Sequence, residues 1–414
     1  DHEDGRVEQR RLGQEGAVAV APRRAAGQHE FFQRREPGVE RGRRRVDALR
    51  AAMERAKASA VLLGSTSSLR YFAGIDWRPS ERFCGALISA ARIDYIAPRF
   101  ELEKVAGLVT LPGDIATWEE DESPWRLIAS LSPAGAIALD PDLPLFMYRA
   151  LRREIDDARL ADAGPLIGPL RARKSSAEIA LMAHAKRLTL EAQRRAHGFL
   201  RPGVMASEVA RFIDETHRAL GADGGAAFSI VAFGADTALP HGPEKDRALA
   251  EGDAVLIDTG CRIDGYNSDI TRSYVFGRPC TDYLAAWEAE REAQGAAFEA
   301  ARRGALCESV DAAARRSLER RGYGPGYALP GLPHRTGHGI GLDIHESPNL
   351  VRGDKTPLDT GMCFSNEPMI VVPGKFGVRH EDHFYMSADG PRWFTEPAAS
   401  LDDPFRRVLP IAAV

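Results

Sequence analysis

The sequence predicts an N-terminal α/β domain and a C-terminal α+β domain, preceded by a leader. Its 414 residues exceed what one hydrophobic core usually organises. Between residues 46 and 172, short apolar runs alternate with helical segments, which is typical of an α/β domain with a mixed sheet. After residue 172, two helical segments followed by strand-like runs occur twice. This duplication predicts an α+β domain made of two similar halves.

Residues 1–45 differ from the rest because arginine pairs and an arginine triplet stand among Glu, Gln and Gly. Interleaved acids dilute the positive charge and no aromatic ladder accompanies it, which disfavours a nucleic-acid-binding arm. We interpret this segment as a solvated leader or an extension, with no function assigned.

The N-terminal domain should begin with a helix at residue 46. The runs AVLLG, CGALISA, IDYIAP and AGAIALD predict strands, and helices are expected near 101–107, 124–131 and 144–157. Ser175 followed three residues later by Glu178 predicts a capping box that starts a new helix. We therefore place the boundary at about residue 172, with domains at 46–172 and 173–414.

The second domain reads as helix, helix and strands, twice over. We expect the two halves to face each other with helices outside and sheets inside, which leaves a concave site between the sheets. The helices are expected at 176–199, 206–220, 283–303 and 308–321, and the strands in AFSIVAFG, DAVLIDTG, DITRSYVFG, GMCFSNEPMIVV and GVRHEDHFYMS.

Charge and cysteine content narrow the class of protein. Lys and Arg total 55 against 59 acids, and a net charge of −4 favours neither nucleic acid nor an anionic membrane. The five cysteines lack CxxC and the dense spacing of a disulfide scaffold, which is typical of a reducing cytoplasm. No apolar run approaches the roughly 20 residues that span a bilayer. We expect a cytoplasmic protein with neither a nucleic-acid nor a membrane partner.

Two aspartates flank a predicted hairpin. Asp258 ends the run AVLID, Asp269 begins the next run, and Asp264-Gly265 between them is a natural turn. If that turn sets the register, Asp258 faces position 271 and Asp269 is its diagonal neighbour, so both carboxylates share one face. A carboxylate directly after four apolar residues needs a partner, because its unpaired burial would cost several kcal/mol.

A second pair of acids follows in the other half. Glu367 lies in the run GMCFSNEPMIVV, and alternation along GVRHEDHF puts Arg379, Glu381 and His383 on one face and His380 on the other. A lone salt bridge would be the structural alternative. Four acids from two hairpins, with a histidine in a glycine-rich turn, suit two divalent cations better.

Charge counting favours the same interpretation. Two divalent ions would cancel the four negative charges, and His338 in HRTGHGIGLDIHESP would add one neutral nitrogen donor. An oxygen-rich set with one imidazole favours manganese, with cobalt or zinc as alternatives.

The segments LPHG, LIDTGCRIDGYNSDITR, HRTGHGIGLDIHESP, SNEPMI and GVRHED resemble the signature of the pita-bread metallopeptidases. The resemblance is to the branch of prolidases (Xaa-Pro dipeptidases) and Xaa-Pro aminopeptidases, and it extends from about 46 to 405. It implies a creatinase-like N-terminal domain, a pita-bread catalytic domain, a homodimer and a dinuclear metal centre bridged by Asp269 and Glu381. The implied metal ligands are Asp258, Asp269, His338, Glu367 and Glu381.

The resemblance also implies roles for residues around the metals. His241 and His345 would line the substrate pocket and stabilise the tetrahedral intermediate, with Glu367 as general base. His334 would lie further out, and Arg352 is a loose, offset counterpart of the arginine that grips the proline carboxylate in some prolidases. The expected substrate-binding residues are His334, Arg352 and Arg379. We expect Gly337, Gly339 and Gly341 to let the backbone approach metal and substrate.

The implied reaction is hydrolysis of the Xaa-Pro bond by a hydroxide that bridges two metal ions. This bond is a tertiary amide without an N–H, so recognition must rest on shape and on the metals. The compact N-terminal domain favours Xaa-Pro dipeptides over longer peptides.

Several alternatives stay open. The chain could be an Xaa-Pro aminopeptidase for longer peptides. Creatinase-like amidinohydrolases do without this metal set, and methionine aminopeptidases usually lack the N-terminal domain. A non-catalytic pita-bread binding module is a different class, but such modules usually lose ligands and none is lost here.

Overall fold

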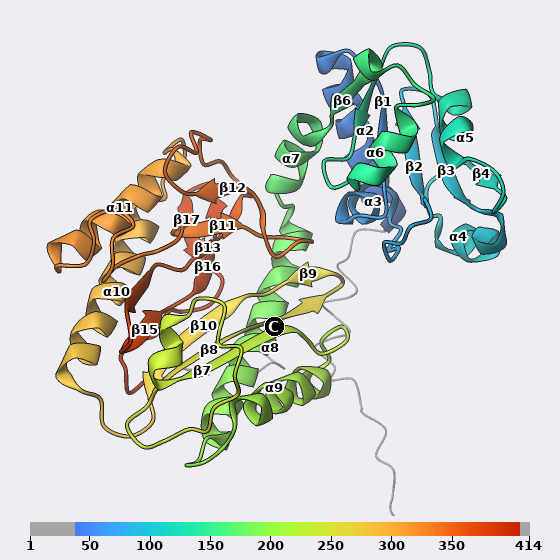
Figure 1. Ribbon diagram of the computed structural model, residues 1–414. Helices are drawn as coiled ribbons and strands as arrows, with labels where there is room; N and C mark the ends of the chain where they lie inside the picture. Colours follow the sequence, from blue (N-terminus) through green and yellow to red (C-terminus); the bar gives the residue numbers. More distant parts are fainter. Residues whose placement is uncertain (1–37, 406–414) are drawn as a thin grey trace, which may run out of the picture. The chain divides into compact units, whose positions relative to one another are not determined.

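The computed structural model describes residues 38–405, which form an N-terminal α/β part and a C-terminal α+β part (Figure 1). Helix α2 runs over Gly38–Ala56, so the helix expected from residue 46 begins earlier than predicted. Of the expected leader, residues 1–37 lie outside the described residues, and the remainder belongs to α2.

The N-terminal part is built on a mixed sheet whose strands are β1 (Ala58–Leu63), β2 (Gly85–Ser89), β3 (Ile93–Pro98), β4 (Asp114–Trp118), β5 (Ala136–Leu139) and β6 (Leu160–Asp162). Their order is β4-β3-β2-β1-β5-β6. Strand β1 is antiparallel to β2 and parallel to β5. Besides α2, the N-terminal part contains the α-helices α3 (Ser67–Ala73), α4 (Leu102–Leu108), α5 (Pro124–Leu131), α6 (Leu145–Leu151) and α7 (Gly164–Ala172).

The central strand shows why this sheet is covered on both faces. Val61 and Leu63 of β1 pack into one hydrophobic cluster, whereas Ala60 and Leu62 pack into another. Successive side chains of a strand point to opposite faces, so a continuous apolar run buries both. The edge strands β4 and β6 carry partly exposed residues, which explains why no apolar run predicts them.

The C-terminal part repeats one arrangement twice. Its first half contains α8 (Ser176–Phe199), α9 (Ala206–Leu220), β7 (Ala226–Phe233), β8 (Ala254–Ile263), β9 (Tyr266–Asn267) and β10 (Ile270–Val275). The predicted capping box of Ser175 and Glu178 starts α8. The second half contains α10 (Thr281–Ala300), α11 (Cys307–Arg320), β11 (Gly337–Gly339), β12 (Glu346–Leu350), β13 (Cys363–Asn366), β14 (Met369–Val372), β15 (Phe376–Arg379), β16 (Asp382–Ser387) and β17 (Gly390–Trp393).

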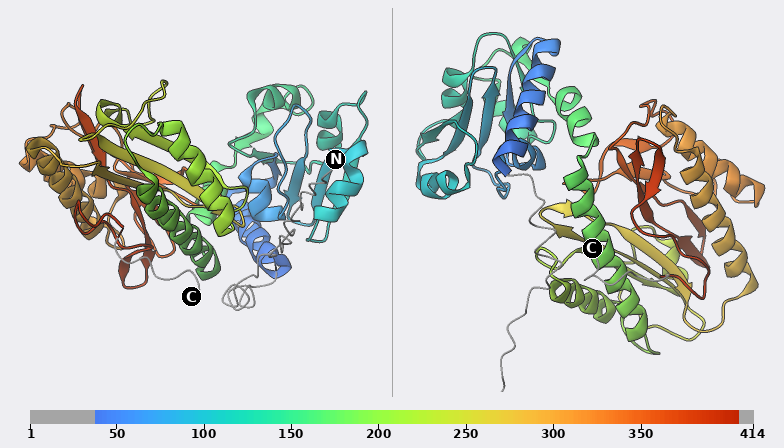
Figure 2. Two further views of the ribbon diagram at one scale, coloured as in Figure 1. Left: turned by 90° about the horizontal axis from the view of Figure 1, so that it is seen from below. Right: turned by 180° about the vertical axis from the view of Figure 1, so that it is seen from behind.

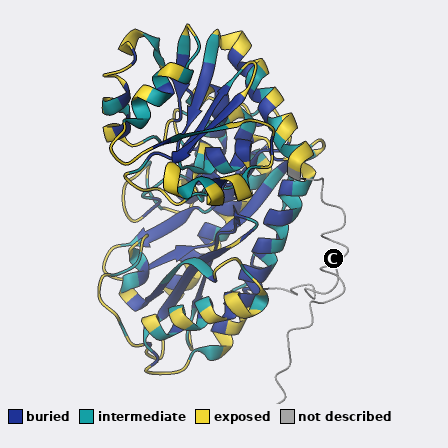
Figure 3. Ribbon diagram, turned by 90° about the vertical axis from the view of Figure 1, so that its right-hand side faces the viewer, coloured by how far each residue is buried: buried dark blue, intermediate teal, exposed yellow. Residues whose placement is uncertain are grey.

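The strands of this part lie between its two helix pairs, as expected (Figure 2). The first sheet has the order β10-β8-β7, and the second β12-β11-β13-β16-β17. An isolated bridge between Thr271 and Glu381 joins them, with the Glu381 N–H donating to the Thr271 carbonyl at 3.1 Å. The strands are largely buried, and the exposed residues gather on the helices and loops (Figure 3). Within residues 38–405, no helix combines the length and the apolar character needed to cross a bilayer.

Two strands that the sequence predicts as continuous are interrupted. The run 361–372 divides into β13 and β14, and the run 377–387 divides into β15 and β16. Strands β13 and β16 pair in the five-stranded sheet, whereas β14 and β15 pair in a separate hairpin. The first break falls at Glu367-Pro368, where proline cannot donate to a ladder.

Candidate metal centre and substrate cavity

The hairpin of β8 and β10 brings two aspartates together. Asp258 pairs with Thr271 across the hairpin, which confirms the predicted register. Asp264 (φ 50°) and Gly265 (φ 78°) form the tight turn, and positive φ at both positions matches the twist of the flanking strands. Asp269 directly precedes β10. Both carboxylates are buried, with 7% and 5% of Asp258 and Asp269 exposed.

The two glutamates occupy the strand breaks. Glu367 lies between β13 and β14, and Glu381 lies between β15 and β16. Thr271 Oγ1 donates to Glu381 Oε2 at 2.8 Å, and Ser365 Oγ donates to Glu367 Oε1 at 3.0 Å. The breaks free these residues from the regular ladders, so that side chains from both sheets converge.

His338 lies in strand β11 and not in the expected turn. Its Nδ1 lies 3.0 Å from the Gly339 carbonyl and must donate to it, which leaves the Nε2 lone pair free. A Cβ on Gly337 would lie 2.1 Å from the Ser365 carbonyl oxygen, and one on Gly341 would lie 2.7 Å from a Glu346 carboxylate oxygen. Gly337 and Gly341 therefore allow close packing against neighbouring protein atoms.

The converging donors form a set that fits divalent cations. Asp269, His338 and Glu381 offer ligand atoms within 4.8 Å of one another. His338 Nε2 lies 3.1 Å from Glu367 Oε1, so a lone pair and an oxygen face each other where a cation or proton is required. Buried oxygens of Asp258, Asp269 and Glu381 have no hydrogen-bond partner among the described residues. Such oxygen-rich sets with one imidazole suit hard or borderline divalent ions.

The electrostatics point the same way. Burial, followed by the charges of Glu381 and Asp258, raises the pKa of Asp269 well above its usual value. Burial and the charges of Glu367 and Asp258 likewise raise the pKa of Glu381 well above its usual value. Burial would also raise the pKa of Glu367, but the hydrogen bond and charge of His338 outweigh it and lower that pKa. Burial and mutual repulsion thus disfavour the charged forms of Asp269 and Glu381, and bound cations would favour those forms.

A cavity of about 380 Å³ opens beside these donors. It is lined by three histidines that the sequence selected, His241, His334 and His345, together with Glu367. The His345 ring lies 4.3 Å from the His338 ring, centroid to centroid. Burial lowers the pKa of His334, whose Nδ1 donates to the Arg335 carbonyl at 2.7 Å. The cavity is of a size that small substrates occupy.

The structure revises both expected substrate-binding arginines. Arg379 lines the cavity, but its three guanidinium nitrogens already donate to protein oxygens, including Asp258 Oδ2 at 2.6 Å. Arg379 therefore holds a carboxylate of the donor set. Arg352 does not line this cavity. It lies 5.6 Å from the Tyr327 ring and lines a different cavity, near α11.

Sequence reasoning missed Arg335, which lines the cavity between His334 and the metal-site strand. Its Nη1 donates to Asn349 Oδ1 at 3.0 Å. Among residues 38–405, no carboxylate forms an ion pair with it within 4.0 Å, so its charge is uncompensated locally. The available signal was its position inside the segment HRTGHGIG, directly beside a selected histidine.

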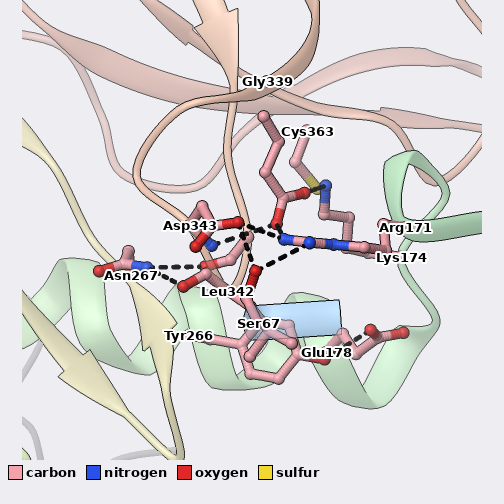
Figure 4. A network of polar contacts seen from close by, with 12 residues as sticks. Ser67, Arg171, Lys174, Glu178, Tyr266, Asn267, Gly339, Leu342, Asp343 and Cys363 are labelled. Carbon is pink, nitrogen blue, oxygen red and sulfur yellow. Dashed lines mark hydrogen bonds and ion pairs between the residues drawn. The ribbon is translucent and has the colours of Figure 1, made fainter. Parts of the chain in front are cut away.

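A polar network anchors the loop that carries His345 (Figure 4). Glu346 accepts from Arg171 Nη2 at 2.6 Å and from Lys174 Nζ at 2.9 Å. Arg171 also contacts Asp343 at 2.7 Å. Burial would raise the pKa of Glu346, but the charges of Lys174 and Arg171 lower it to about 2. The loop is therefore held by two basic side chains, Arg171 at the end of α7 and Lys174 just before α8.

Comparison with known proteins places these features in a family. Metallopeptidase family M24 matches residues 180–388, and the creatinase/prolidase N-terminal domain matches residues 45–173. The Xaa-Pro dipeptidase of Lactobacillus helveticus is 31% identical over 376 residues, 88% of this chain and 99% of the relative. The crystal structure of dipeptidase PepE from Mycobacterium ulcerans has a TM-score of 0.81 at 32% identity, covering 88% of this chain and 98% of that one. X-Pro aminopeptidase from Thermotoga maritima has a TM-score of 0.75 at 26% identity, with 86% and 98% covered.

Four carboxylates and one imidazole beside a histidine-lined cavity suit the chemistry of a metal-dependent hydrolase. The chain belongs to metallopeptidase family M24, in its pita-bread prolidase branch, and is a peptidase. The predicted fold class, a creatinase-like α/β domain followed by an α+β pita-bread domain, is confirmed.

Proposed function

We propose that this metallopeptidase hydrolyses the Xaa-Pro bond of dipeptides. The observation that carries the proposal is the cavity beside the donor set, where Arg335 presents a positive charge without a carboxylate partner among the described residues. The similarity to the Xaa-Pro dipeptidase of Lactobacillus helveticus supports the substrate class. The residues that would hold two divalent cations are Asp258, Asp269, His338, Glu367 and Glu381.

The proposal also covers the metal ion, the cellular compartment, the oligomeric state and the domain limits. Four carboxylates and one imidazole favour Mn²⁺, with Co²⁺ or Zn²⁺ as alternatives. All five cysteines are free, which supports a reducing cytoplasm. We retain a homodimer, and domain limits of 46–172 and 173–414, as proposals.

The mechanism divides between cations and side chains. When bound, the cations would lower the pKa of a water molecule and polarise the peptide carbonyl. Glu367, at the cavity wall, takes the proton from the attacking water and passes it to the proline nitrogen as that nitrogen leaves. His241 and His345 donate hydrogen bonds to the carbonyl oxygen as negative charge develops on it. Arg379 orients Asp258, and its charge opposes the rise in the Asp258 pKa that burial causes.

Arg335 would select dipeptides by their free carboxylate. A proline in the leaving position has no N–H to donate, so its carboxylate is the strongest remaining handle. A guanidinium binds a carboxylate through two parallel hydrogen bonds. In a longer peptide an amide replaces this carboxylate, and the additional residue needs space. The lost charge contact and the steric demand both disfavour binding of the longer peptide.

The test compares an Xaa-Pro dipeptide with its C-terminal amide and with the same sequence extended by one residue, each with Mn²⁺. We expect Arg335→Ala to lower kcat/KM for the dipeptide by about 10- to 100-fold, because one charge-assisted contact of about 1.5–3 kcal/mol is lost. The same substitution should lower kcat/KM for the dipeptide amide only slightly. Arg352→Ala is the matched control and should change neither. Equal cleavage of the tripeptide by the parent enzyme would make the chain an Xaa-Pro aminopeptidase.

The aminopeptidase is the second candidate, because the Thermotoga maritima X-Pro aminopeptidase covers the chain almost as fully as the dipeptidases do. A non-catalytic binding module is disfavoured, since all five proposed donors are present and four of them, Asp258, Asp269, His338 and Glu381, are buried. A parent protein that neither binds nor is activated by a divalent cation would restore that reading.

A further inference from the structure

A second layer of polar side chains lies directly under the metal-site carboxylates. Strands β13 and β16 pair with Ser365 opposite His383, so these two side chains share a face. Both residues are fully buried. Ser365 Oγ accepts from the His338 N–H at 2.9 Å and donates to Glu367 Oε1 at 3.0 Å. Ser365 thus positions two of the proposed ligands, while its partner His383 has no assigned role.

The His383 ring forms no regular hydrogen bond with the described residues. Neither of its nitrogens has a partner at normal hydrogen-bond geometry, although the side chain is fully buried and the Asp269 backbone lies beside it. Its Nε2 lies 3.8 Å from Glu381 Oε1, and that oxygen also lacks a partner among the described residues. The other oxygen, Oε2, accepts from Thr271. Leaving two buried polar atoms unpaired costs about 1–3 kcal/mol each.

His380, three residues earlier, provides the contrast. Its side chain points to the opposite face of the chain, where Nε2 lies 3.4 Å from Glu290 Oε2 and the ring lies 4.6 Å from the Trp287 ring. Both histidines are fully buried and both lie within two residues of Glu381, but His380 belongs to the layer under α10. The pair therefore separates a role at the metal centre from mere burial of an imidazole.

We propose that His383 is a positioning residue of the metal centre, which donates its Nε2–H to Glu381 Oε1. A shortening of the present separation by about 1 Å forms a normal hydrogen bond. Thr271 and His383 then hold one oxygen each, and the Glu381 carboxylate is fixed in the orientation that a bridging ligand needs. This inference rests on the proposed metal site. Outer partners of this kind typically change metal affinity by about 10- to 100-fold when removed.

The experiment measures Mn²⁺ affinity of metal-free protein by competition with a chromophoric chelator, so it needs no peptide substrate. His383→Leu retains the volume and removes the donor, whereas His383→Gln retains an N–H near the position of Nε2. We expect about 10- to 100-fold weaker binding for His383→Leu and recovery to within a few-fold for His383→Gln. His380→Leu, the matched control, should bind like the parent. His383→Ala replaces the leucine variant if that variant does not fold.

A double-mutant cycle completes the test. In a Glu381→Gln background, His383→Leu should cause little further loss, because the contact it removes is already broken. Parent-like affinity of His383→Leu overturns the inference while the metal site stands. Equal losses in the leucine and glutamine variants, with a changed Co²⁺ absorption spectrum, would make His383 a direct ligand and also overturn it. Failure of the parent protein to bind Mn²⁺ would refute the metal site itself, and this inference with it.

Discussion

The residues of the site fall into those that hold cations and those that face substrate. His241 and His345 line the cavity but do not belong to the cluster of Asp269, His338 and Glu381. His345 packs its ring against His338 without replacing it as a donor. Replacing a cavity histidine should therefore lower the catalytic rate, whereas replacing a proposed ligand should lower metal binding.

We expect His241→Ala or His345→Ala to lower kcat by about 10²- to 10³-fold, the usual effect of removing one hydrogen-bond donor to a developing oxyanion. Metal content should stay at the parent level. Steady-state kinetics and elemental analysis of the same preparations measure both quantities. A parallel fall of metal content and kcat would assign these histidines to the metal centre instead.

At this scale the sequence was informative where local geometry decides. The register of one hairpin placed Asp258 opposite Thr271, and strand alternation separated His380 from Glu381. The contacts of the arginines were harder to predict because they depend on distant segments. Arg379 reaches Asp258, 121 positions earlier in the chain, and Arg335 acquires its place from the walls of the cavity.

At the scale of elements, the loop before β12 is held by charge. Glu346 is nearly buried, with 7% of its side chain exposed, and it carries the contacts of Arg171 and Lys174. Since the next residue toward the N-terminus is His345, the same contacts that stabilise the loop orient a proposed substrate-binding side chain. Stability and catalysis are therefore linked through one carboxylate.

The Glu346→Gln variant tests this link through pH. The folded-state pKa of Glu346, about 2, lies below its ordinary 4.5, so the stabilisation is complete above about pH 4.5 and is lost as the pH falls toward 2. The free-energy advantage of the parent over Glu346→Gln should shrink by about 3 kcal/mol across that window. Urea unfolding at successive pH values measures it. Glu54→Gln, at an exposed position of α2, is the control, and an advantage independent of pH would contradict the prediction.

The strand breaks show where prediction from sequence stops at this scale. The runs that contain Glu367 and Glu381 were each predicted as one strand because apolar residues stand on both sides of each glutamate. Only pairing with different partners reveals the breaks, since β13 and β16 join one sheet while β14 and β15 form another. Pro368 was the local signal for the first break, and nothing comparable marks the second.

At the scale of the whole molecule, the duplication visible in the sequence explains the site. Asp258 and Asp269 come from the first half of the catalytic part, and His338, Glu367 and Glu381 come from the second. Among the isolated β-bridges of the described residues, one joins the two sheets, and it pairs Thr271 with Glu381. Cations held by both sets of ligands would therefore add to the buried ion pairs, Arg379–Asp258 and Arg272–Asp382, that already join the two halves.

This arrangement predicts that removal of the metals destabilises the fold. A ligand that binds the native state at 100 times its Kd stabilises that state by about 2.7 kcal/mol. For a chain of 414 residues, with an unfolding entropy of about 2.1 cal/mol/K per residue, the corresponding change in Tm is about 3 °C. We expect EDTA to lower the Tm of the Mn²⁺-loaded parent by this amount, and readdition of excess Mn²⁺ to restore it, in calorimetric scans. Asp269→Asn, which removes an anionic donor while keeping the side-chain shape, should unfold at nearly the same temperature with and without EDTA. Identical scans of the parent in both conditions would show that the two halves hold together without the cations and that the buried carboxylates are compensated in another way.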